Sequence, residues 1–246
     1  MSISSTALWI GSMHRLGVVA ATVAAAILLS SVSAAAQDPN LIDQGRYDIT
    51  VGDRIAGTET FAIRRQGEGY MAVGRIQLEG DGTWLRSAEF GLRTDGAYAP
   101  VRFETHALGR PAYTLIVTRS GTRLRITTSS EEGDRMTEML AAPDQVLLGT
   151  GIAQHYYFVI RRLTAGGEQP LELGAILPGD GQEQPIRVVN VTTTEIAIDG
   201  APQTANRYDL DVGSTRHIVW ADVAGGRILK VEVPDRQWTS VRQPDN

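Results

Sequence analysis

Apolar and polar residues alternate along most of the chain, in short runs separated by turn signals rich in glycine and aspartate. In residues 46–51, RYDITV, alternation puts Tyr47, Ile49 and Val51 on one face of a strand. One apolar and one polar face is typical of an antiparallel sheet with a solvated side. Turn signals recur roughly every eight to twelve residues, a spacing that indicates a sandwich or barrel.

The same pattern predicts strands on both sides of the middle of the chain. They cover residues 46–51, 58–64, 70–78, 84–93, 101–108, 112–118 and 122–129, and then 171–176, 186–191, 195–198, 205–212 and 238–242. No linker or low-complexity segment separates the two sets. The sequence therefore predicts a single β-rich domain.

Residues 151–163, GIAQHYYFVIRRL, interrupt the alternation. Helical spacing puts one apolar stripe on this segment, made of Ile152, Tyr156, Val159, Ile160 and Leu163. We expect a helix with Thr150 as its N-cap, ended by Ala165-Gly166-Gly167. The alternative is a buried strand over residues 155–160, because aromatic and β-branched residues dominate there. With the helix, the fold class is α+β and mostly β: an antiparallel sheet curled into a half-barrel or barrel around one short helix.

Residues 213–233 hold a serine, a histidine and an aspartate close together, as a catalytic triad would require. Alternation along a strand puts His217 on the opposite face from both Ser214 and Asp222. The chain also lacks a Gly-x-Ser-x-Gly nucleophile elbow. We therefore interpret the segment as a β-hairpin.

The hairpin turns either at Gly225-Gly226 or in a four-residue loop over residues 223–226. Either turn predicts an inward apolar face and an outward charged face. The inward set is Ile218, Trp220, Leu229, Val231 and Val233, and the outward set is His217, Lys230 and Glu232. The longer loop also puts Asp222 opposite Arg227.

A short sequence occurs twice in similar form. Residues 46–52 read RYDITVG and residues 207–213 read RYDLDVG. The likeness indicates either a duplicated half-sheet or two strands that lead by chance into similar glycine turns. Because nothing on either side aligns, we favour chance.

The first residues resemble an export signal. Arg15 precedes an apolar run over residues 16–29, and Ala34-Ala35-Ala36 provides a cleavage site. We expect cleavage after Ala36, export to the periplasm, and a mature domain of residues 37–246 with no transmembrane helix. The alternative is an uncleaved N-terminal anchor.

Composition excludes several chemistries. The chain has no cysteine, which excludes disulfides, iron–sulfur clusters and cysteine nucleophiles. Its net charge of −5 and scattered arginines argue against a nucleic-acid partner. His106, His155 and His217 lie on separate elements without zinc-motif spacing, so no metal site is expected. Phosphate-binding motifs are absent, and no cofactor is expected.

A curled sheet with an apolar concave side could hold an apolar ligand. The candidate ligand-binding residues are Trp84, Phe90, Phe103, Tyr113, Tyr156, Phe158 and Trp220. The same side chains could simply form a packed core.

The strand–glycine turn–strand of residues 47–59, the short aromatic helix and the apolar hairpin resemble a family of periplasmic proteins, domain of unknown function 3108. The resemblance covers most of residues 46–242. It implies a half-barrel similar to that of periplasmic lipoprotein carriers, and no established activity. From the export signal, the sheet-plus-helix architecture and the lack of a catalytic cluster, we expect a non-catalytic periplasmic protein of the cell envelope that binds a lipid or other apolar ligand, or an envelope protein. The alternatives are a hydrolase whose site forms only in the fold, and a structural scaffold with a filled core.

Overall fold

The computed structural model describes residues 38–79, 85–109, 112–165, 172–224 and 226–244, and those from 38 onward belong to one unit. The signal peptide predicted for residues 1–36 and the candidate Trp84 lie outside the described residues. Among the described residues, no helix has the length and apolar character that a membrane crossing requires.

Strands make up most of the described chain. The first half holds β1 (Leu41–Val51), β2 (Arg54–Gln66), β3 (Gly69–Leu78), β4 (Leu85–Thr94), β5 (Pro100–Gly109), β6 (Tyr113–Ser120), β7 (Arg123–Ser130), β8 (Gly133–Leu140) and β9 (Gln145–Leu147). After helix α1 (His155–Thr164) come β10 (Glu172–Leu177), β11 (Gln182–Ile198), β12 (Ala201–Val212), β13 (Thr215–Asp222), β14 (Ile228–Val233), the short 3-10 helix η1 (Pro234–Arg236) and β15 (Trp238–Arg242).

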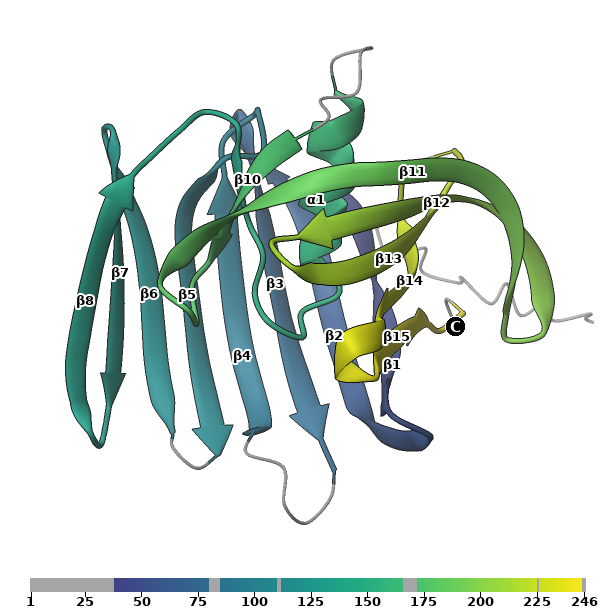
Figure 1. Ribbon diagram of the computed structural model, residues 1–246, viewed down its shortest axis with the longest axis horizontal. Coiled ribbons are helices and arrows are strands. Elements are labelled where there is room, and N and C mark those ends of the chain that lie inside the picture. Colours follow the sequence, from purple (N-terminus) through teal and green to yellow (C-terminus); the bar gives the residue numbers. More distant parts are fainter. Residues whose placement is uncertain (1–37, 80–84, 110–111, 166–171, 225, 245–246) are drawn as a thin grey trace, which may run out of the picture. The chain divides into compact units, whose positions relative to one another are not determined.

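All these strands form one sheet in the order β8-β7-β6-β5-β4-β3-β2-β1-β15-β14-β13-β12-β11-β10-β9. Most strands that follow one another in sequence pair antiparallel, but β9 pairs parallel with β10, and β8 and β9 form the two ends of the sheet and do not pair with each other. The two halves join where β1 pairs with β15, with Ile49 opposite Ser240. The sheet is not closed, but it curls so that α1 lies within the curve (Figure 1). The prediction of a mostly β fold, with an antiparallel sheet curled around one short helix, is confirmed.

The helix begins later than the sequence pattern indicated. Its N-cap is Gln154, not Thr150, and the residues before it form turns. The predicted stripe is buried, but His155, Tyr157 and Phe158 are buried as well. Because the curled sheet surrounds the helix, its burial extends beyond one stripe. This explains why aromatic and β-branched residues also suggested a strand here.

Three strands differ from those predicted. The sequence analysis missed β8, which is almost entirely exposed and has no apolar face, and β9, which is only three residues long. It also divided β11, which runs unbroken over seventeen residues, with a register shift between Val188 and Asn190. An irregularity of this kind interrupts side-chain alternation without ending the strand.

The β13–β14 hairpin is present, and its Val231, Val233, Lys230 and Glu232 face as predicted. The predicted facing was wrong for Ile218, Trp220, Leu229 and His217. Trp220 pairs with Lys230 and Ile218 with Glu232, so these four side chains share the outer face. His217 belongs to the inner face together with Val219. Asp222 lies opposite Arg227 as expected, with an ion pair of 2.7 Å.

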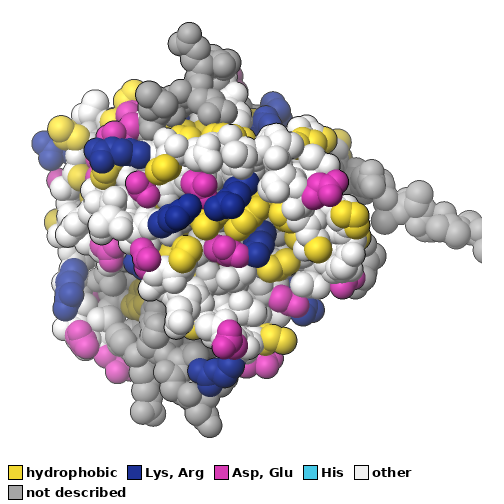
Figure 2. Space-filling view, turned by 45° about the vertical axis from the view of Figure 1, so that its right-hand side comes forward, with side chains coloured by type: hydrophobic (Ala, Val, Ile, Leu, Met, Phe, Trp, Pro, Cys, Tyr) yellow, Lys and Arg dark blue, Asp and Glu magenta, His cyan; other side chains and the backbone are white. Residues whose placement is uncertain are grey.

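A second, small core explains the error. Trp220, Ile218 and Leu229 pack with Ile198 and Ala205 of the β11–β12 hairpin. Arg207 and Lys230 lie over the Trp220 ring, 5.6 and 4.9 Å from its centre. Figure 2 shows this side of the molecule, with hydrophobic side chains between basic and acidic ones. Since β13 is covered on both faces, apolar residues alone could not distinguish inside from outside.

The two similar sequences take similar positions in β1 and β12. Tyr47 and Tyr208 are both buried, and each strand leads into a turn whose glycine, Gly52 or Gly213, has a positive φ. Only glycine adopts this backbone conformation readily. The shared turn geometry accounts for the shared glycine without a duplicated half-sheet.

Candidate ligand-binding cavity

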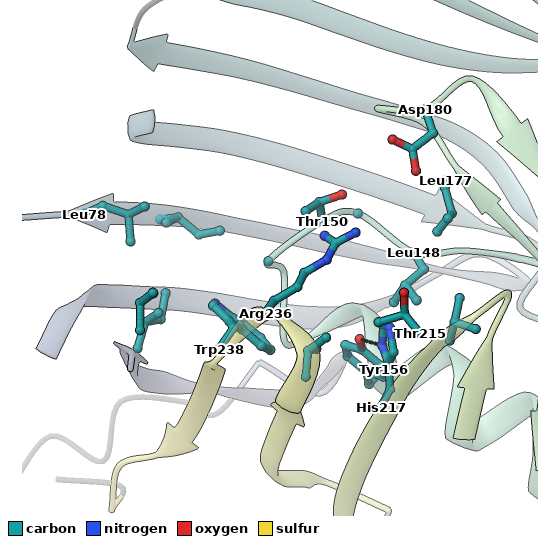
Figure 3. Close-up of a pocket in the computed structure, with 17 residues that line it drawn as sticks. Leu78, Leu148, Thr150, Tyr156, Leu177, Asp180, Thr215, His217, Arg236 and Trp238 are labelled. Carbon is teal, nitrogen blue, oxygen red and sulfur yellow. Dashed lines mark hydrogen bonds between the residues drawn. The ribbon is translucent and has the colours of Figure 1, made fainter. Parts of the chain in front are cut away.

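A cavity of about 320 Å³ lies between the concave face of the sheet and the loop that leads into α1 (Figure 3). Its volume is at the lower end of the roughly 300–1,000 Å³ of small-molecule sites. Most of the wall is apolar, and the polar groups are few. The lining residues are Ile49, Val51, Ile76, Leu78, Leu148, Gly149, Thr150, Gly151, Tyr156, Leu177, Asp180, Val212, Thr215, His217, Val233, Arg236 and Trp238.

Strands from both halves of the sheet form the cavity. Ile49 comes from β1 and Ile76 from β3, whereas Val212 comes from β12 and His217 from β13. Thr150, Asp180 and Arg236 are exposed at the rim. The cavity therefore has an apolar wall and a polar rim.

A buried tyrosine–histidine pair forms one side of the cavity. The Tyr156 hydroxyl lies 2.5 Å from Nδ1 of His217 (Figure 3). Burial, together with the nearby Arg236 charge, lowers the pKa of His217 to about 4, and burial raises the pKa of Tyr156. At neutral pH the pair is therefore a neutral phenol hydrogen-bonded to a neutral imidazole. Neither group is poised as a base or nucleophile near neutral pH.

Glu59 is a buried carboxylate that the sequence analysis did not identify. It accepts hydrogen bonds from the backbone N–H groups of Ala153, at 2.7 Å, and Gln154, at 3.1 Å. Burial outweighs these bonds and raises its pKa to about 7. Glu59 therefore holds the entry to α1, and the cavity-lining loop before it, against β2. A signal was present, because Glu59 alternates with the inward-facing Phe61 and Ile63.

His155 belongs to the core beside this loop. Its Nδ1 accepts a hydrogen bond of 2.9 Å from the Gly149 N–H, and its ring packs edge-on against Phe90 and Phe103. Burial lowers its pKa to about 3, so it is neutral. These contacts indicate a structural role in shaping the loop.

The same loop also lines a smaller cavity of about 60 Å³. It shares Ile76, Gly149 and Thr150 with the larger cavity, and Phe103 and Tyr113 also line it. Gly149 and Thr150 of this loop therefore contribute to two cavities.

The candidate binding residues lie in different parts of the structure and do not line one cavity together. Tyr156 lines the main cavity, and Phe103 and Tyr113 line the smaller one. Phe158 is fully buried in the main core. Phe90 lines a depression of about 350 Å³ together with Met71 and Arg93. Trp220 lies in the small outer core and does not line the main cavity, so its predicted inward position is corrected.

Several cavity residues were not among the candidates. His217 had been assigned to the outer face, and Arg236, Thr150 and Asp180 lie in turns that carry no periodic pattern. Among the described residues, no group of three or more histidine, aspartate or glutamate side chains is arranged to hold a metal ion.

Comparison with solved structures finds a likeness in fold. The chain resembles a solved structure titled a beta-barrel-like protein of domain of unknown function DUF1849 from Brucella abortus. The TM-score is 0.50 with 9% sequence identity, over 81% of this chain and 94% of that one. No model of a known protein family matches the chain. No curated protein matches it in sequence. The likeness shows a barrel-like fold of unknown function, whereas the family 3108 resemblance stays a prediction.

Proposed function

We propose that this protein binds an apolar or amphiphilic ligand in the cavity of about 320 Å³ and has no catalytic role. The observation that carries the proposal is an apolar wall formed by both halves of the sheet, with few polar groups beyond the rim, namely Thr215 and the Tyr156–His217 pair. Apolar clefts with a few polar groups are the usual form of small-molecule sites. The neutral state of both members of the pair supports binding over catalysis.

A substitution at Thr215 tests whether the cavity binds ligand. Thr215 is half-buried at the start of β13 and lines the cavity beside His217 (Figure 3). Thr215→Trp is expected to fill the space and weaken binding of the neutral apolar probe N-phenylnaphthylamine by about tenfold or more. Fluorescence titration of the purified protein measures this effect.

The matched control is Arg216→Trp. Arg216 is the next residue of β13, so its side chain points to the opposite face of the sheet. This variant should bind the probe as the unchanged protein does. Equal affinity in both variants would place the probe elsewhere, and no binding by the unchanged protein would favour the filled scaffold.

We also propose that the signal peptide is cleaved after Ala36 and that the protein acts in the periplasm. Support comes from the N-terminal sequence pattern, and cleavage there would leave β1, which begins at Leu41, intact. A periplasmic location would agree with the location implied by the family 3108 resemblance.

Expression with its own N-terminus in a Gram-negative host tests the export proposal. The periplasmic fraction should contain a chain whose mass corresponds to residues 37–246. Placing arginines within residues 16–29 should retain the full-length precursor in the cell, because the signal needs an apolar segment there. A full-length chain that stays with the inner membrane would favour the uncleaved anchor.

A further inference from the structure

A positively charged side chain, that of Arg236, lies at the edge of the apolar cavity. Arg236 lines the cavity together with Val233 and Trp238, and its guanidinium extends toward Thr150 (Figure 3). Among the described residues, no hydrogen bond or ion pair joins this guanidinium to another side chain. An arginine with all its donors free can bind a carboxylate or phosphate in a bidentate manner.

The backbone holds Arg236 in a fixed turn. Arg236 is the last residue of η1, and the Gln237 N–H closes the turn by donating to the Pro234 carbonyl at 2.9 Å. The Gln237 carbonyl in turn accepts a bond of 2.7 Å from the Gly52 N–H. The β1–β2 turn therefore anchors η1, so the position of the arginine does not depend on a free loop.

The charge of Arg236 acts on groups in the cavity wall. After burial, it is the next cause that lowers the pKa of His217, ahead of the opposing charge of Asp235, and it partly offsets the effect of burial on the pKa of Tyr156. Its positive potential therefore reaches into a space whose walls are mostly apolar.

We propose that the cavity selects amphiphiles with an anionic head, a carboxylate or a phosphate, and that Arg236 binds this head while the apolar chain lies against Ile49, Ile76 and Val212. This inference rests on the proposed function and names its ligand class. The anionic head would then contact the Arg236 guanidinium, and the apolar chain would contact the apolar wall.

Two carboxylates near the site do not neutralise Arg236 by direct contact. Asp180 lies on the far side of the rim, in the β10–β11 turn, with no ion pair to Arg236 (Figure 3). Asp235 accepts a hydrogen bond of 3.4 Å from the backbone N–H of Arg216. An anionic head therefore fits beside Arg236, away from Asp180.

The experiment measures displacement of N-phenylnaphthylamine by four amphiphiles with the same chain, below their micelle concentrations. Dodecanoate and dodecyl phosphate should bind about tenfold or more tightly than dodecanol, and dodecyltrimethylammonium most weakly. Arg236→Gln should remove this preference, because both anions then bind about as weakly as dodecanol. Asp180→Asn should strengthen anion binding by up to about fivefold.

Arg216→Gln is the matched control, since it removes the same charge from the outer face of the sheet. It should keep the preference for anions. The proposal of an anionic head would be overturned by equal binding of dodecanol and dodecanoate to the unchanged protein. It would also be overturned if Arg236→Gln kept the preference for anions. If the neutral probe and all four amphiphiles fail to bind, the cavity proposal itself fails and this inference with it.

Discussion

Acidification from about pH 7 to about pH 5 is expected to lower the free energy of unfolding by about 2 kcal/mol in the unchanged protein and about 4 kcal/mol in Glu59→Gln. Two buried histidines and one buried glutamate respond to acid in opposite directions. The variant removes the glutamate and leaves the histidines.

Acidification lowers the contribution of the two histidines to the free energy of unfolding. Burial lowers the folded-state pKa of His155 to about 3 and of His217 to about 4, from an ordinary value of 6.5. The unfolded chain therefore binds more protons than the folded chain between these values. Their contribution is fully present above the unfolded pKa and is lost as the pH falls below it. At about pH 5 each histidine has lost about 2 kcal/mol.

Glu59 changes stability in the other direction. Burial raises its folded-state pKa to about 7, from an ordinary value of 4.5. The folded chain therefore binds more protons than the unfolded chain between these two values. Its buried charge is unfavourable above the folded pKa, and protonation relieves that cost as the pH falls. Between about pH 7 and about pH 5 the gain is about 2 kcal/mol.

Urea unfolding at a series of pH values, followed by tryptophan fluorescence, measures the slope of the free energy of unfolding against pH. Glu89→Gln is the matched control, because it removes an exposed carboxylate from β4 and should keep the slope of the unchanged protein. A Glu59→Gln slope no steeper than that of the control would show that Glu59 is not a buried, proton-binding group in the folded state.

Gly57→Ala is expected to lower the free energy of unfolding by about 2–5 kcal/mol. Gly57 lies in β2 opposite Leu78, with a φ of 152°. A Cβ atom there would lie 2.0 Å from the Gln77 carbonyl oxygen. Because that oxygen belongs to the backbone, no side-chain rotation can relieve the overlap, and β2 and β3 would have to separate.

Gly52→Ala separates the steric effect from that of backbone conformation. Gly52 also has a positive φ, 62°, but nothing lies within 4 Å of a Cβ atom there. It should cost about 1–2 kcal/mol, the expense of left-handed backbone alone. Thermal and urea unfolding compare the two variants. An equal loss in both would show that the sheet accommodates the Gly57 methyl group by moving.

Periodicity identified most of this fold because most strands have one covered face. Turns such as Gly52-Asp53 and the alternation of Tyr47 and Ile49 are local properties, and local sequence is enough to reveal them. The same method missed β8, whose side chains are exposed on both faces, and put Trp220 on the wrong face of β13, which is covered on both. Alternation distinguishes the two faces of a strand only when one of them is solvated.

The candidate site was less predictable than the fold. Tyr156 and His217 are separated by sixty-one positions, and their contact depends on how far the sheet curls around α1. Arg236 enters the cavity from a short turn without periodicity. Glu59 could have been recognised from its inward position in β2, but its partners, the N–H groups of Ala153 and Gln154, could not.

The sequence by itself determined the β-rich class, the break in the strand pattern at residues 151–163 and the absence of cysteine chemistry, since these follow from composition and local periodicity. Only the tertiary structure decided which faces of β13 are inward, that both halves of the sheet share one cavity, and that Arg236 stands at its rim. The physical reason is that a cavity is formed by strands distant in sequence, and the sheet's curvature, more than any local pattern, sets their separation.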